Sequence, residues 1–182
     1  MSSILSALVA QLYTLVIVDM QPGFSASNDK RTIKAVMDEI RRAIKDGAFI
    51  IVIESDRKKY GSTHAELLDL LADYDSERWS IETKFWRYND QYSPHSGALQ
   101  VAEACEVFGF PTGRFRVCGV NTDICVFFTA MELGKRFPLS KLEIVMRACN
   151  VPELGFAVDT AKSFRYYAGV HKFTNFELVD FE

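Results

Sequence analysis

The chain has 182 residues, of which 48% are apolar and 25% are charged, and its formal net charge is −3. This length predicts a single domain over residues 1–182, with a core large enough to fold without disulfide or metal staples. The apolar fraction excludes a disordered chain. The mild acidity, with a pI of about 5.7, gives no reason to expect nucleic acid or an anionic membrane as a partner.

The four cysteines, Cys105, Cys118, Cys125 and Cys149, form no CxxC pair. Disulfide frameworks are typical of small secreted domains, and zinc ribbons need such pairs. We therefore expect reduced thiols in a cytoplasmic protein. The apolar stretch at 4–20 is interrupted by polar residues and has no Lys or Arg before it, so we expect neither a signal peptide nor a membrane span.

Continuous apolar runs alternate with helical patterns along the chain, and they predict the secondary structure. Runs rich in Val and Ile indicate strands buried on both faces, whereas apolar residues spaced three and four apart indicate helices. In chain order the predicted elements are a strand at 15–18, a helix at 28–45 closed by Gly47, a strand at 49–53, a helix capped by Ser62 or Thr63 and ending at 72, a short strand near 81–85, a helix at 96–108, a strand at 115–120, a helix at 123–136, a strand at 142–146, a loop and helix at 152–167, and a last strand at 176–179.

This alternation predicts an α/β fold with three layers, α/β/α, around a doubly wound, mostly parallel sheet of about six strands. Ligands bind such sheets beyond the carboxyl ends of the strands, near the point where the strand order reverses. Two chemistry-bearing residues fall at strand ends. Asp19 directly follows the first predicted strand, and Cys125 follows the strand that ends at Val120.

Cys125 lies where the chain leaves a strand and begins a helix. A thiol in the first turn of a helix feels the positive end of the macrodipole, which favours the nucleophilic thiolate, and the free backbone N–H groups there can hold an oxyanion. The alternative is a buried structural cysteine, a common fate of this residue. By position alone the structural reading is favoured, and it is the one we expect for Cys105, Cys118 and Cys149.

A nucleophile needs a base, and none of the three histidines, His64, His95 and His171, falls at a predicted strand end. Asp19 is another base, because a carboxylate ending an apolar strand is costly unless it serves a purpose. Its alternative role is a loop or capping carboxylate. Lys84 is a cation among aromatic residues, and its alternative is a solvated surface lysine.

Three segments of the chain resemble one known family. The run LVIVDMQPGF at 15–24 resembles the opening motif of the isochorismatase-like cysteine hydrolases, in which an apolar strand ends in D-x-Q-x-x-F. The run CGVNTDICV at 118–126, followed by Thr129 and Ala130, resembles the family motif G-V-x-T-D-x-C-V-x-x-T-A. Lys84 stands between them in the family's order. The resemblance covers about residues 13–150 and implies that Asp19, Lys84 and Cys125 form a catalytic triad.

The resemblance also implies a mechanism. Asp19 would accept the proton of Cys125 and later activate water, and Lys84 would orient both side chains and favour their charged forms. Cys125 would attack a carbonyl carbon and form an acyl-enzyme that water hydrolyses. The oxyanion hole would consist of the backbone N–H groups of Asn121 and Cys125, and the Val120–Asn121 peptide bond would be cis.

Nicotinamidases within this family bind a divalent metal through Asp-x-His and further histidines after the second strand. Here Asp56 and His64 stand where two ligands belong, but the position two after Asp56 is Lys58, whose ammonium has no lone pair. It can neutralise Asp56 instead. One Asp and one His rarely hold a metal alone, so we expect no metal and no other cofactor, and His64 reads as a surface helix residue.

The substrate pocket is less defined by the sequence. Phe24 matches a family aromatic that packs against the substrate, and Trp86, Tyr88 and Tyr92 follow Lys84 in an aromatic loop. These aromatics suit core or interface packing equally well. Gln21 reads as loop support. The family commonly forms homo-oligomers, and fourteen Phe residues suit an apolar interface.

The leading hypothesis is therefore a hydrolase that cleaves a C–N bond in a small carboxamide or carbamoyl compound. A vinyl ether hydrolase of the isochorismatase type is an alternative, which does not need the cysteine. A non-catalytic binding module on the same fold is a second alternative, since fold does not imply function.

Overall fold

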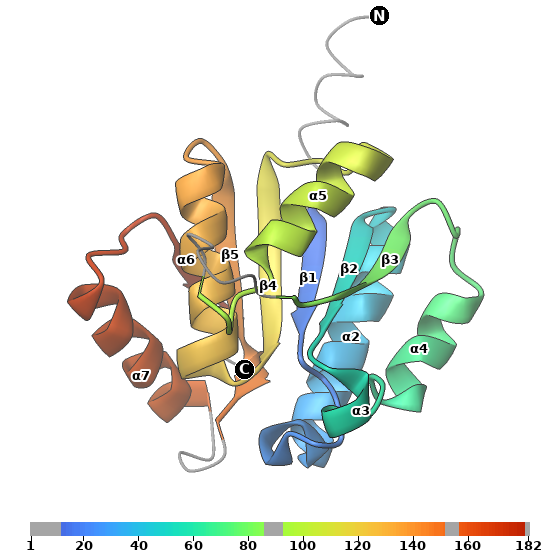
Figure 1. The fold of residues 1–182 in the computed structure, drawn as a ribbon, viewed down its shortest axis with the longest axis horizontal. Coiled ribbons are helices and arrows are strands. Elements are labelled where there is room, and N and C mark those ends of the chain that lie inside the picture. Colours follow the sequence, from blue (N-terminus) through green and yellow to red (C-terminus); the bar gives the residue numbers. More distant parts are fainter. Residues whose placement is uncertain (1–11, 86–92, 152–156, 181–182) are drawn as a thin grey trace, which may run out of the picture.

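The structure is a computed structural model, which describes residues 12–85, 93–151 and 157–180. Six parallel strands form one sheet in the order β3-β2-β1-β4-β5-β6, and helices cover both of its faces (Figure 1). This is the three-layer α/β fold predicted from the alternating pattern. The strands are β1 (Thr14–Val18), β2 (Phe49–Glu54), β3 (Trp79–Thr83), β4 (Arg114–Val120), β5 (Lys141–Asn150) and β6 (Glu177–Val179).

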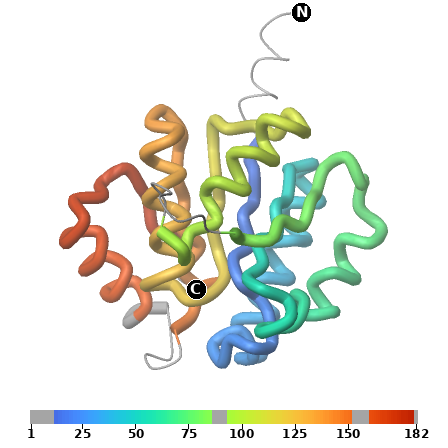
Figure 2. The backbone as a smooth tube through the Cα atoms, viewed as in Figure 1, coloured from blue at the N-terminus to red at the C-terminus, as the bar shows by residue number. Residues whose placement is uncertain are grey.

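The chain winds outward from β1 to β3, returns to β4 beside β1, and then winds the other way to β6 (Figure 2). The strand order therefore reverses between β1 and β4. Each crossover carries helical structure, as parallel strands require. These elements are a 3-10 turn η1 (Ser25–Asn28), α2 (Lys30–Asp46), α3 (Arg57–Tyr60), α4 (Ala65–Ala72), α5 (Ala98–Phe108), a π-helical turn η2 (Thr122–Val126), α6 (Phe127–Arg136) and α7 (Ala157–Val170).

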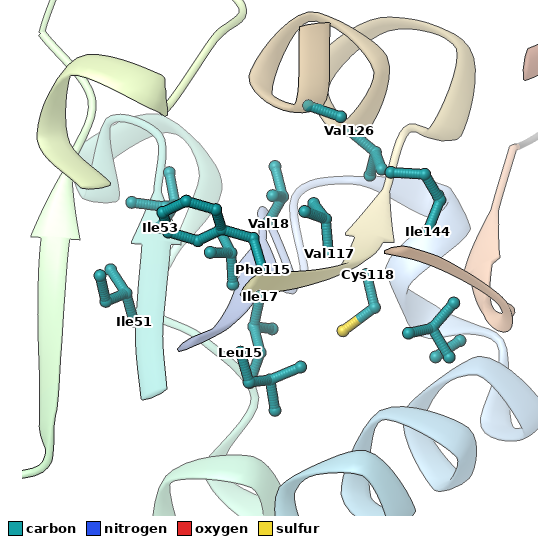
Figure 3. Packing of buried hydrophobic residues seen from close by; sticks show 14 of the residues in the cluster. Leu15, Ile17, Val18, Ile51, Ile53, Phe115, Val117, Cys118, Val126 and Ile144 are labelled. Atoms are coloured by element: carbon teal, nitrogen blue, oxygen red, sulfur yellow. The ribbon is translucent and has the colours of Figure 1, made fainter. Parts of the chain in front are cut away.

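The apolar runs form the centre of the core. All five residues of β1 are buried, and its side chains pack with those of the neighbouring strands (Figure 3). Cys118 of β4 lies within this cluster, fully buried, and Cys105 and Cys149 are buried as well. These three thiols therefore have the packing positions expected of them.

The caps of α2 follow ordinary helix chemistry. The Asp29 side chain accepts hydrogen bonds from the backbone N–H groups of Arg31 and Thr32, and this lowers the pKa of that carboxyl against the effect of its partial burial. Gly47 ends the helix in the left-handed conformation, as predicted. The helix begins at Lys30, two residues later than expected, because 25–28 form a separate 3-10 turn.

Two local predictions were wrong, and one short helix was not predicted. Neither Ser62 nor Thr63 caps α4, which begins after His64, because the Thr63 backbone N–H and hydroxyl both donate to Glu54 Oε1 at 2.7 Å. Strand β5 was expected to end at residue 146, but its pairing with β4 continues to Asn150 through a register shift after Val117. A separate short helix, α3, precedes α4.

Gly119 allows β4 to approach β1 closely where the two strands end. Its φ angle is +117°, and a Cβ atom at this position would lie 2.1 Å from the carbonyl oxygen of Val18. Any side chain would therefore meet a backbone that cannot rotate away. This contact brings the residues after β1 and β4 together at the carboxyl edge of the sheet.

A buried charge cluster lies near the opposite, amino-terminal ends of β4 and β5. Arg116 donates to Glu39 Oε2 at 2.8 Å and to Glu143 Oε2 at 2.9 Å, and also to Asp180 beyond β6. Glu39 and Glu143 are buried, and hydrogen bonds from arginines and Lys141 hold the pKa of Glu143 below its ordinary value despite that burial. The cluster thus links α2, β4, β5 and the C-terminal strand.

Within the parts of the chain that the structure describes, no helix is both long enough and apolar enough to cross a membrane.

Candidate active site

Three residues of the sequence motifs lie at the carboxyl edge of the sheet, two directly after strands and one within a turn. Asp19 follows β1, Lys84 follows β3, and Cys125 lies in the π-helical turn η2 that begins two residues after β4. Because β1 and β4 flank the reversal of strand order, Asp19 and Cys125 meet at the switch point of the sheet. Lys84 reaches them from beyond β2, anchored by its backbone N–H to Glu54 O at 2.7 Å.

Asp19 is fully buried and accepts hydrogen bonds at both carboxylate oxygens. The Lys84 ammonium donates to Oδ2, and the Ser55 hydroxyl donates to Oδ1 at 3.0 Å. The backbone of Asp19 has a positive φ of 53°, which is uncommon for a residue with a side chain. Buried carboxyl groups are tolerated when they are paired and hydrogen-bonded, and both oxygens of Asp19 have such partners.

Cys125 is 5% exposed and hydrogen-bonds the Asp19 side chain. Burial raises the pKa of its thiol to about 12, although the Lys84 ammonium and a backbone N–H act in the opposite direction. The expectation that the helix start favours a thiolate is therefore wrong for the resting site, because desolvation outweighs the helix and the lysine. The thiol is neutral at pH 7 and has a carboxylate acceptor beside it.

The backbone before Cys125 has an unusual conformation. The Val120–Asn121 peptide bond is cis, and the backbone N–H of Asn121 hydrogen-bonds the Cys125 sulfur. The backbone N–H groups of Ile124 and Val126 both donate to Asn121 O at 3.1 Å. The Asn121 side-chain Oδ1 is buried and lacks a hydrogen-bond partner among the described atoms. The turn thus directs the Asn121 N–H towards the sulfur.

Gln21 supports the neighbouring loop, as predicted. Its amide nitrogen donates to Ser55 O at 3.1 Å and to Gly61 O, and its Oε1 accepts from the Ser55 backbone N–H at 2.7 Å. These bonds fix the residue whose hydroxyl contacts Asp19. Ser55 was missed by the sequence reasoning. The signal that points to it is its position directly after β2, the strand that pairs with β1.

Phe24, the predicted pocket aromatic, packs against another aromatic ring. Its ring stacks on that of Tyr60 with centroids 4.2 Å apart and planes 9° apart. Tyr60, at the end of α3, is a second aromatic that the sequence did not single out. Trp86, Tyr88 and Tyr92 lie outside the described residues.

The two candidate metal ligands have other partners. Asp56 Oδ1 accepts from the Lys58 backbone N–H at 2.9 Å and so caps α3, and His64 Nε2 lies 3.0 Å from the Ser27 hydroxyl. The remaining ligand position is an ammonium, Lys58. His64 is partly buried at the start of α4 and is not a surface helix residue. Over 12–85, 93–151 and 157–180 no three His, Cys, Asp or Glu side chains gather as a metal cluster. These donors do not fit the divalent metal of the nicotinamidases.

No family model and no curated protein matches the chain. Solved structures match at low identity. The pyrazinamidase/nicotinamidase of Streptococcus mutans UA159 is 15% identical, with a TM-score of 0.66 over 92% of this chain and 99% of that one. The YcaC gene product of Escherichia coli, described as an octameric hydrolase of unknown specificity, is 14% identical, with a TM-score of 0.66 over 94% and 76%.

The MAR1 ribonuclease of Caenorhabditis elegans is 18% identical, with a TM-score of 0.65 over 88% of this chain and 74% of that one. At such identities a structural likeness establishes the fold alone, and the nicotinamidase and the ribonuclease differ in their named activities. The likeness extends over nearly the whole described chain. The chain therefore has the isochorismatase-like fold that its motifs predict.

Proposed function

We propose that the chain is a cysteine hydrolase that cleaves the C–N bond of a small carboxamide or carbamoyl compound. The observation that carries the proposal is the buried contact between Asp19 and Lys84 beside the Cys125 thiol, at the switch point of the sheet. A nucleophile, a base and a cation seldom share a desolvated position without chemistry to perform.

The chemistry begins from the neutral thiol. As the sulfur attacks the carbonyl carbon, Asp19 accepts its proton, so that no free thiolate has to form in the buried site. The backbone N–H groups of Asn121 and Cys125 receive the developing oxyanion. Collapse of the tetrahedral intermediate breaks the C–N bond, and the proton on Asp19 passes to the leaving nitrogen.

The second half restores the enzyme. Asp19 takes a proton from water, whose oxygen attacks the thioester carbon, and the acid leaves as the sulfur regains that proton. Lys84 keeps Asp19 oriented through both halves and stabilises the partial negative charge that develops on the sulfur while its proton is being transferred. Neither half uses a metal or another cofactor.

The test is ammonia release from a panel of carboxamides and carbamoyl compounds that includes nicotinamide and pyrazinamide. We expect turnover by the wild type and a loss of at least about 1,000-fold in Cys125→Ala, Asp19→Asn and Lys84→Met. Cys105→Ala, which removes another buried thiol, is the matched control and should keep its activity. Mass spectrometry of quenched reactions should find the acyl group on the peptide containing Cys125.

Two outcomes would refute this function. Vinyl ether cleavage that survives Cys125→Ala would identify the isochorismatase-type reaction. Binding of panel compounds without turnover by the wild type would identify a binding module.

We also propose that the chain acts as a homo-oligomer. Its described surface exposes Val107 and Phe108 at the end of α5 and Tyr166 and Val170 on α7, each between 55% and 73% exposed. Apolar side chains of this size gather at subunit interfaces. Light scattering after size-exclusion chromatography should give a mass that is a multiple of 20.6 kDa, and a monomer at micromolar concentration would refute the proposal.

A further inference from the structure

Helix α6 carries two buried polar side chains that the proposed triad does not use. Thr129 is fully buried and Glu132 is 5% exposed. They stand three residues apart and therefore lie on the same side of the helix. Thr129 also belongs to the motif that contains Cys125, where it has no chemical role of its own.

Both side chains accept hydrogen bonds from one short segment, the turn formed by residues 93–97. Thr129 Oγ1 accepts from the Gly97 backbone N–H at 2.9 Å, and Glu132 Oε1 accepts from the Ser93 backbone N–H at 2.7 Å. The Ser96 N–H donates to Ser93 O at 2.9 Å and closes the turn. Helix α6 thus holds this turn at both of its ends.

The middle of the turn contacts the site. The carbonyl oxygen of His95 accepts a hydrogen bond from the Lys84 ammonium at 3.1 Å. The same ammonium donates to Asp19. A continuous set of contacts therefore runs from α6, through the turn, to the cation of the proposed triad.

The Glu132 carboxyl is costly to keep buried on α6. Burial raises the pKa of Glu132 although the Ser96 hydroxyl lies nearby, and its Oε2 atom is buried without a hydrogen-bond partner among the described atoms. An apolar residue would pack at this position without that desolvation cost. The carboxylate supplies an acceptor for the Ser93 N–H that an apolar side chain lacks.

We propose that Thr129 and Glu132 are positioning residues, which fix the 93–97 turn so that the His95 carbonyl holds Lys84 against Asp19 and Cys125. The inference rests on the proposed function for its purpose, but its geometry can be tested without turnover. Lys84 is the cation that lowers the pKa of the Cys125 thiol. Displacement of Lys84 therefore slows the reaction of that thiol with an alkylating agent.

The experiment measures the rate at which iodoacetamide alkylates Cys125 at pH 8, followed by mass spectrometry of the peptide that contains it. Thr129→Val keeps the shape of the side chain and removes the acceptor, and it is made in the wild type and in Lys84→Met. Thr129→Ser restores the acceptor. Thr14→Val is the matched control, because it removes a buried hydroxyl, bonded to Pro111 O at 2.8 Å, from the opposite end of β1.

We expect Thr129→Val to slow alkylation by about threefold or more in the wild type and to have little effect in Lys84→Met. Thr129→Ser and Thr14→Val should both react like the wild type. Glu132→Ala should slow alkylation as Thr129→Val does, and Glu132→Gln, which keeps an acceptor for Ser93, should not. If Thr129→Val does not fold, the comparison of Glu132→Ala with Glu132→Gln tests the same proposal.

Equal slowing in both backgrounds would overturn the proposal, because the effect would not pass through Lys84. Faster alkylation in Thr129→Val, or no change, would overturn it too. A Lys84→Met chain that reacts as fast as the wild type would remove its basis. Failure of the carboxamide panel would refute the proposed function and leave this comparison unchanged.

Discussion

Replacement of Gly119 by alanine should destabilise the chain strongly, because two penalties coincide there. The φ angle of +117° lies where an L residue is strained by about 1–2 kcal/mol. The new Cβ would lie 2.1 Å, 2.7 Å and 2.9 Å from the O, N and C atoms of Val18. Relief of such overpacking by backbone movement costs about 1–3 kcal/mol more. We expect the free energy of unfolding to fall by about 2–5 kcal/mol.

Two other glycines allow the backbone strain and the steric contact to be measured separately. Gly109 has a positive φ of 70° but nothing within 4 Å of its Cβ position, so Gly109→Ala should cost only the strain of about 1–2 kcal/mol. Gly113 has open space and no positive φ, so Gly113→Ala should change stability by less than about 1 kcal/mol. Urea unfolding followed by circular dichroism measures all three.

The order Gly119→Ala, then Gly109→Ala, then Gly113→Ala is the expected ranking of the loss. If Gly119→Ala costs no more than Gly109→Ala, the close approach of β4 to Val18 is not what requires glycine. Because Val18 precedes Asp19, Gly119→Ala should also lower any hydrolytic activity at temperatures where the variant remains folded. Retention of full activity by such a folded variant would contradict the assigned place of Asp19 in the site.

Three further predictions concern buried charge and buried thiols. Arg116→Met should lower the free energy of unfolding by about 3–5 kcal/mol, because Glu39 and Glu143 lose their shared buried partner. The control is Arg41→Met, which removes an exposed ion pair with Asp38 and should cost less than about 1 kcal/mol. Equal losses of the two variants in urea unfolding would contradict this. Cys105 has its pKa raised to about 12 by burial, so its contribution to stability is complete below the unfolded pKa and is lost as pH rises towards 12. Cys105→Ala should therefore show a shallower fall in stability than the wild type between pH 9 and pH 11, and parallel curves would refute that assignment. Alkylation of Cys125 should accelerate close to tenfold per pH unit from pH 7 to pH 10, since its thiol titrates near pH 12; a plateau by pH 8.5 would show a thiol of much lower pKa.

Much of the fold followed from local pattern. The apolar run before Asp19 is long enough and β-branched enough to form a strand buried on both faces, and the alternation of such runs with helical spacing requires parallel strands with crossovers. Element ends were less predictable. The extension of β5 to Asn150 depends on pairing with Gly119 and Val120, which lie 30 residues earlier.

The candidate site was likewise predictable in part. Its motif residues could be named from the sequence, because the residue types and their spacing near Asp19 and Cys125 are local properties of the chain. Their environment could not. The Ser55 hydroxyl and the His95 carbonyl come from separate loops, which only the folded sheet brings together around Asp19 and Lys84.

The ionisation of Cys125 is the clearest case of a property that tertiary structure decided. By itself the sequence determined that a cysteine follows a strand and begins a helix, a position that favours a thiolate. The fold buries that residue to 5% exposure, and the loss of hydration outweighs the nearby ammonium. Local sequence can specify which groups are neighbours in the chain, whereas desolvation depends on every segment that packs over them.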